Sequence, residues 1–138
     1  MEKLTHRSVI RALQESWDIK TSSIPDEWSE ANRARGQCVP SSLVVQDYFG
    51  GELERVMATG DALSESHYFN RLVDGGVIDS TAMQYSMYAP TKFTRMPVDL
   101  AAKNCMTIRE YVLKSEQTLA RYALLKTRVM DLLEMAEE

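Results

Sequence analysis

The sequence is poor in the residues that build metal sites, membrane spans and export signals. Only two cysteines and two histidines occur among its 138 residues, and without a CxxC or HxxxH pair the usual zinc-ligand spacings are missing. No apolar run approaches the roughly 20 residues of a membrane span. The first ten residues also lack the apolar region of a secretory signal. We therefore expect no metal, no membrane association and a cytoplasmic location, where a Cys38–Cys105 disulfide is not expected.

Basic charge is scarce as well. The chain has 16 Lys and Arg against 20 Asp and Glu, a formal net charge of −4, and nowhere are four basic residues consecutive. Proteins that bind nucleic acids usually display a basic patch, because neutralising phosphates drives their affinity. We therefore expect no nucleic-acid partner. A peptide or small-molecule substrate is the partner that we expect.

The length and composition are those of one globular domain spanning residues 1–138. Hydrophobic residues make up 44% of the chain and charged residues 26%, close to the averages of folded proteins. A chain of this size buries roughly two thirds of the surface that it exposes when unfolded, which is enough for one core. No internal repeat or low-complexity tract suggests a further unit.

Hydrophobic spacing predicts helices at both ends of the chain and short strands between them, an α+β fold. Leu4, Ile10, Leu13 and Trp17 form the apolar stripe of the first helix. In order, the expected elements are a helix over 4–17, a loop over 21–35, a helix from Cys38 to the glycines at 50–51, a strand over 52–57, a polar connector over 58–65, strands over 67–72 and 77–81 joined by a DGG turn, and helices over 107–114 and 115–135. Residues 83–105 remain ambiguous.

A candidate nucleophile lies where the helix after the long loop begins. The reactive form of cysteine is the thiolate, which a helix N-terminus and a neighbouring imidazolium both favour. Cys38 is placed for the first influence, and His67 is the main candidate for the second. An imidazole also needs an acceptor that fixes its tautomer, and Asp79 on the following strand can supply it. These residues predict a Cys-His-Asp triad.

The pairing of the two strands decides whether that triad can assemble. Asp79 follows His67 by an even number of residues, so both side chains can point to one face of a sheet. They become direct cross-strand neighbours only in the register that pairs Phe69 with Val77. A tight two-residue turn would instead pair Leu72 with Asp79.

Acyl chemistry also requires donors for an oxyanion. The backbone N–H of Cys38 and the side chain of Gln37 are the first candidates, and Asn70 is a weaker one. Trp28, in the loop before the cysteine, either lines the site or pins the loop to the core. The same residues also fit purely structural roles, with Cys38 buried at a helix start and His67 bonded to backbone.

Three blocks of the sequence resemble the YunG family of bacterial proteins. They are PDEW…N…GQC…SLVVQDYFGGEL at 25–53, SHYFNRL…DGGVIDST…Q at 66–84, and RYALLKTRV at 121–129. The family carries no established activity, so this resemblance implies identity rather than function.

The order Cys38, His67, Asp79 and then Thr81 is also similar to that of transglutaminase-like and papain-like cysteine enzymes. This likeness implies a helix that carries the cysteine and packs on a small antiparallel sheet. It also implies a cysteine-dependent hydrolase or acyl transferase that acts on an amide, isopeptide or ester bond without a cofactor. The helix opening CVPSSL departs from the pattern, and the chain is short for these enzymes. The alternatives are a non-catalytic binding or regulatory module with the same fold, and redox sensing through Cys38.

Overall fold

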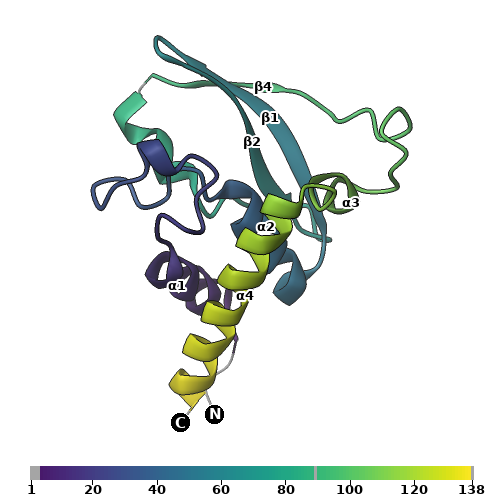
Figure 1. The fold of residues 1–138 in the computed structure, drawn as a ribbon. Helices are drawn as coiled ribbons and strands as arrows, with labels where there is room; N and C mark the ends of the chain where they lie inside the picture. The colour runs from purple at the N-terminus through teal and green to yellow at the C-terminus, as the bar shows by residue number, and fades with distance from the viewer. Residues whose placement is uncertain (1–3, 89, 138) are drawn as a thin grey trace.

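The computed structural model describes residues 4–88 and 90–137, which form an α+β structure with one antiparallel sheet (Figure 1). This confirms the predicted fold class. The elements are α1 (His6–Ser16), the 3-10 helix η1 (Pro25–Glu27), α2 (Cys38–Phe49), β1 (Glu52–Gly60), β2 (Leu63–Arg71), β3 (Val77–Ile78), the 3-10 helix η2 (Ala82–Tyr88), β4 (Lys92–Arg95), α3 (Ile108–Val112) and α4 (Glu116–Glu137).

The sheet has the strand order β3-β2-β1-β4. β1 and β2 form a long hairpin in which Gly60 pairs with Leu63, so the polar connector predicted over 58–65 is wrong. Ala58 and Leu63 are buried within that stretch, and only Asp61 and Ala62 between the two strands form the turn. β4 pairs with the outer edge of β1, in the region that the sequence left ambiguous.

Of the three longer helices, α2 begins at Cys38 as predicted, whereas α4 begins one residue and α1 two residues after the predicted starts at 115 and 4. Thr5 caps α1 in a capping box with Ser8, and Ser115 accepts a hydrogen bond from the backbone of Thr118 at the start of α4. α4 packs along α1 and α2 (Figure 1). Two residues of the predicted apolar stripes, Leu4 and Leu119, are however 46% and 49% exposed, and Leu4 lies before the start of α1.

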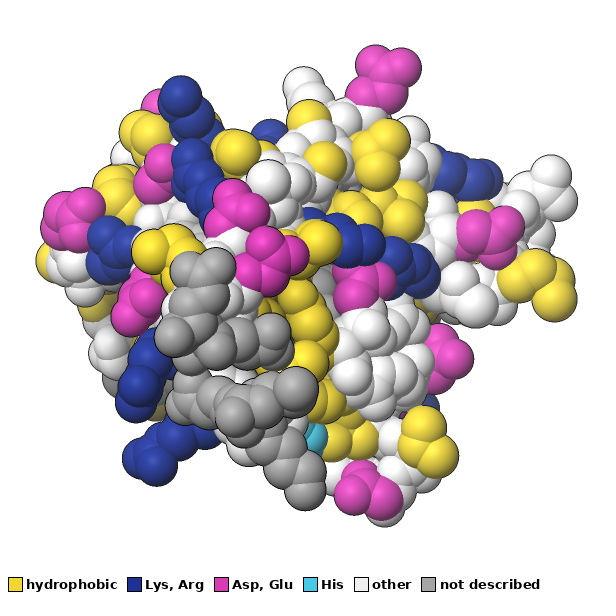
Figure 2. Space-filling view, turned by 90° about the horizontal axis from the view of Figure 1, so that it is seen from below, with side chains coloured by type: hydrophobic (Ala, Val, Ile, Leu, Met, Phe, Trp, Pro, Cys, Tyr) yellow, Lys and Arg dark blue, Asp and Glu magenta, His cyan; other side chains and the backbone are white. Residues whose placement is uncertain are grey.

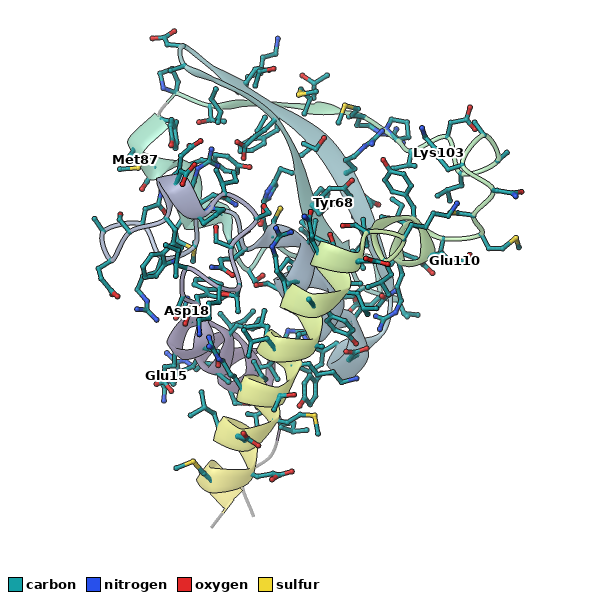
Figure 3. All side chains as sticks on the ribbon, in the orientation of Figure 1. Glu15, Asp18, Tyr68, Met87, Lys103 and Glu110 are labelled. Atoms are coloured by element: carbon teal, nitrogen blue, oxygen red, sulfur yellow. The ribbon has the colours of Figure 1, made fainter. Side chains whose placement is uncertain are left out.

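The two faces of the sheet cover different parts of the molecule. Leu53, Tyr68 and Asn70 share one face, which packs toward α2 in the main core. Figure 3 shows Tyr68 between the sheet and the helices α2 and α4, whereas Met87 of η2 lies well to the side. On the other face, Ala58 joins Leu63 and Tyr85 of η2 in a second, smaller core. The sheet therefore carries η2 on one face and α2 on the other.

The surface mixes charges of both signs. Figure 2 shows Lys and Arg side chains close to Asp and Glu side chains, with hydrophobic patches between them. Across residues 4–88 and 90–137, none of the helices combines the length and the apolarity that a bilayer crossing requires.

Candidate functional site

Cys38 is the first residue of α2, as the sequence predicts, and its free thiol is half-buried. The turn that leads into it depends on Gly36, whose φ of 78° lies in the left-handed region. A Cβ at this position would collide with the side chain of Ser22, so a glycine is required. The first-turn N–H groups of a helix have no intrahelical acceptor. The Cys38 N–H is therefore available to a ligand.

His67 and Asp79 form the predicted pair. The His67 Nε2 lies 2.8 Å from the Asp79 Oδ2, and the histidine side chain is only 1% exposed. The strands pair Asn70 with Ile78, so continuing this register places Asp79 level with Phe69. The requirement for a directly opposed pair was therefore wrong. The two side chains share one sheet face and meet diagonally, which side chains of this length can span.

The environment of His67 favours its protonated form. Burial is the largest single influence and lowers the pKa of His67. The hydrogen bond to Asp79 and the interaction with Cys38 together raise this pKa by more than burial lowers it, to about 9. The His67 Nδ1 is buried and has no hydrogen-bond partner among the described residues. One ring nitrogen is thus fixed by the carboxylate, and the other makes no hydrogen bond to any described residue.

Two aromatic residues that the sequence did not single out enclose the imidazole. The ring of Tyr85 lies edge-on to His67 with centroids 5.1 Å apart, and the ring of Phe93 lies 6.1 Å away. Tyr85 and Phe93 also contact each other, with centroids 5.5 Å apart. Both come from the ambiguous region 83–105. The alternation KFTR, with one aromatic residue among exposed polar ones, was the available signal for β4.

A buried arginine ties the segment before Cys38 to the strand that carries His67. Arg35 is 2% exposed and grips both carboxylate oxygens of Glu65, at 2.6 and 2.7 Å. It also pairs with Glu27 of η1 at 2.9 Å. Bidentate pairs of this kind fix orientation as well as distance. Since Glu65 stands two places before His67 on the same sheet face, Arg35 positions the cysteine loop against the histidine.

Gln84 of η2 completes this network. Its Oε1 accepts hydrogen bonds from Arg35 Nη1 at 3.1 Å and from the Gly36 N–H at 3.3 Å, while its Nε2 donates to the Thr81 hydroxyl at 3.1 Å. Gln84 therefore links the turn before Cys38 to the segment just after Asp79. Thr81, which the sequence analysis named after Cys38, His67 and Asp79, thus accepts a hydrogen bond from this network.

The remaining predicted residues lie around the site with other partners. The Gln37 Nε2 donates to the Asp18 carbonyl at 3.0 Å, and its buried Oε1 has no partner within the described chain. The Asn70 Nδ2 donates to the Ser42 carbonyl of α2 at 2.9 Å, on the sheet face opposite His67. This bond attaches β2 to α2.

Trp28 is held within its own loop, because its Nε1 donates to the Arg33 carbonyl at 2.9 Å. Its ring also faces the Arg33 guanidinium at 5.9 Å. The indole therefore contributes to the shape of the long loop that precedes Cys38. Within residues 4–88 and 90–137, no three His, Cys, Asp or Glu side chains gather as metal ligands would.

Comparison with known proteins gives one family and one relative. The family model described as "YunG protein" matches residues 5–134. The "Uncharacterized protein YunG" of Bacillus subtilis (strain 168) is 33% identical over 85 residues, which cover 62% of this chain and 65% of that protein. The match therefore spans slightly less than two thirds of the relative. No solved structure matches this chain.

Proposed function

This chain belongs to the YunG family, and we propose that it is a cysteine-dependent hydrolase or acyl transferase acting on an amide, isopeptide or ester bond. The observation that carries the proposal is the buried His67–Asp79 hydrogen bond of 2.8 Å, in a histidine whose pKa is also raised by Cys38. A thiol at a helix start, an imidazole and a carboxylate are the three parts that such chemistry needs.

The proposed reaction begins with the Cys38 thiolate. It attacks the carbonyl carbon of the substrate, so that a C–S bond forms and the carbonyl electron pair moves onto oxygen. As the tetrahedral intermediate collapses, His67 Nδ1 gives its proton to the departing nitrogen or oxygen, and the bond to that atom breaks. Water or an acceptor amine then attacks the thioester carbonyl and gives a proton to His67. The C–S bond breaks, which releases the carboxylic acid or the new amide and restores the Cys38 thiolate.

The oxyanion would form next to the start of α2. The Cys38 N–H is the first donor, and the helix dipole adds to its effect. Gln37 Nε2 uses one N–H on the Asp18 carbonyl and retains a second. Asp79 holds the imidazole in the tautomer that presents Nδ1 to the thiol, because its carboxylate occupies Nε2.

The finer fold assignment belongs to the same proposal. A papain-like or transglutaminase-like fold is supported by the cysteine that begins a helix and by the helix that packs on an antiparallel sheet. It is also supported by the order of the triad, in which the acid follows the histidine one strand later.

Acetylation by p-nitrophenyl acetate tests the proposed chemistry. We expect an acetyl group on Cys38, found by peptide mass spectrometry, together with repeated release of nitrophenol. Cys38→Ala should abolish both signals, whereas the matched variant Cys105→Ala should retain them. Asp79→Asn should slow acetylation by about 10- to 100-fold, since it leaves the imidazole without its charged acceptor. Equal acetylation of both cysteines, with no turnover, would contradict the proposal.

A non-catalytic binding or regulatory module is the second candidate. The observation that favours it is the 1% exposure of His67, because a sealed imidazole also suits a purely structural hydrogen bond. Nitrophenol release no faster than spontaneous hydrolysis, in the wild type and in Cys38→Ala alike, would support this alternative.

A further inference from the structure

A groove of about 540 Å³ lies beside the triad on the sheet. Its floor is made by residues that alternate on the sheet face carrying His67, and its wall by the segment after β4. The floor consists of Glu54, Val56, Phe69, Arg71 and Arg95, and the wall includes Pro97, Val98, Leu100 and Ile108. We call this feature the arginine groove, because Arg55 lines it too.

The strand register places the arginine groove close to His67. Val56 pairs with His67 on one side and with Arg95 on the other, so the three residues form one row across the sheet. With strands about 4.8 Å apart, the Cα atoms of His67 and Arg95 are about 10 Å apart. Phe93, two places before Arg95, already touches His67. This row spans about three extended residues, so a peptide substrate held beside His67 can extend into the groove.

The groove carries positive charge that the protein does not neutralise. Arg71 pairs with Glu54 at 2.6 Å, but Arg55 donates only to the carbonyls of Met96 and Pro97, at 2.8 and 3.1 Å. Arg95 is exposed and makes no ion pair with any described residue.

Two guanidinium charges therefore lack a carboxylate at one place in a chain whose net charge is −4. Positive charge that gathers beside apolar walls fits a ligand that carries a negative charge and an apolar part.

We propose that the arginine groove binds an acidic side chain of a peptide substrate, with Arg95 as the ligand of the carboxylate. This inference rests on the proposed function, since it assigns the substrate class of the same site. Arg55 supplies charge but is committed to the backbone of the groove wall, whereas Arg95 has a free planar fork that matches a carboxylate. The substrates that we expect are acidic peptides whose Asp or Glu lies close to the bond attacked.

Two matched alkylating probes test this assignment. N-iodoacetyl-Gly-Glu-amide and N-iodoacetyl-Gly-Gln-amide have the same length and differ only in charge. We expect the Glu probe to alkylate Cys38 about 3- to 5-fold faster at low ionic strength, the range of a partly exposed ion pair. In Arg95→Gln the ratio should fall to about 1, and salt should reduce it in the wild type. Lys92→Gln, which removes the same charge from the opposite face of β4, should keep the ratio.

The outcomes separate this inference from the proposed function. A ratio of 1 in the wild type, or one that Arg95→Gln leaves unchanged, overturns the groove assignment even if iodoacetamide still reacts with Cys38 in a His67-dependent way. If Cys38 reacts with none of these reagents, binding alone decides. In Cys38→Ser, N-acetyl-Gly-Glu-amide should shift the NMR amide signals around Arg95, and Arg95→Gln should abolish the shifts. No shift, or equal shifts with the Gln peptide, overturns the assignment.

Discussion

At the scale of single residues, side-chain chemistry was enough to choose the candidate site residues but not the residues that hold them in place. Cys38, His67 and Asp79 could be chosen because few other side chains in the sequence can act as nucleophile and base. Arg35 and Glu65 could not, since an ion pair between residues thirty apart leaves no periodic signal in the sequence. The sequence also did not predict that His67 meets Asp79 diagonally, because the register of β2 with β3 depends on the conformation of the turn between them.

The raised pKa of His67 predicts how stability depends on pH. The pKa of about 9 in the folded protein lies above the ordinary histidine value of 6.5, so the native state binds the proton more tightly than the unfolded chain. The resulting stabilisation is fully present below about pH 6.5 and is lost as the pH rises through about 9. We expect the free energy of unfolding to fall by about 1–3 kcal/mol between these limits.

Urea unfolding of wild type and Asp79→Asn at pH 6, 8 and 10 measures this loss, and Asp79→Asn should show a much smaller one. Asp61→Asn, an exposed change at the β1–β2 turn, serves as the control and should follow the wild type. Parallel pH profiles for wild type and Asp79→Asn would show that the pair does not hold the proton.

At the scale of elements, caps and turns were readable but short or polar strands were not. The start of α2 could be predicted from the turn at Gly36 and the proline at position 40, whereas the sequence placed the start of the first helix at Leu4, before the Thr5 cap. β4 was not predicted because its four residues are all exposed, and the alternation KFTR is too short to identify a strand by itself. The extension of β1 and β2 was hidden by Ser64 and Glu65, which read as a polar connector. Pairing with a partner strand outweighs such local propensities.

Arg35 joins three of these elements, and its removal should be costly. In Arg35→Met the carboxylate of Glu65 and the amide of Gln84 lose their partner in a mostly buried site. We expect a loss of about 2–4 kcal/mol in the free energy of unfolding, measured by urea denaturation, because breaking a buried pair leaves a charge uncompensated.

Arg71→Met is the matched comparison, since it removes an exposed pair with Glu54 and should change stability little. If both variants unfold at the same urea concentration, the Arg35 network does not hold the loop to β2.

At the scale of the whole molecule, the site lies where three separate parts meet. α2 brings the thiol, the β2–β3 hairpin brings the imidazole and the carboxylate, and η2 with the long loop covers them. The terminal helices α1 and α4 support α2 from the other side and contribute no triad residue (Figure 1). The sequence predicted α2, the two strands and the long loop but not η2. How the long loop and η2 fit against β2 depends on contacts such as Gln84 with Gly36, which only the folded chain defines.

The most direct test of this assembly is the rate at which iodoacetamide alkylates Cys38 as a function of pH, followed by mass spectrometry. With His67 protonated beside the thiol, Cys38 should react well below pH 7 and faster than Cys105. His67→Ala should reduce the rate at pH 6 by about tenfold or more. His6→Ala, a change at the exposed start of α1, should have no effect. If His67→Ala leaves the profile of Cys38 unchanged, the thiol and the imidazole do not act together, and the proposed enzyme is contradicted.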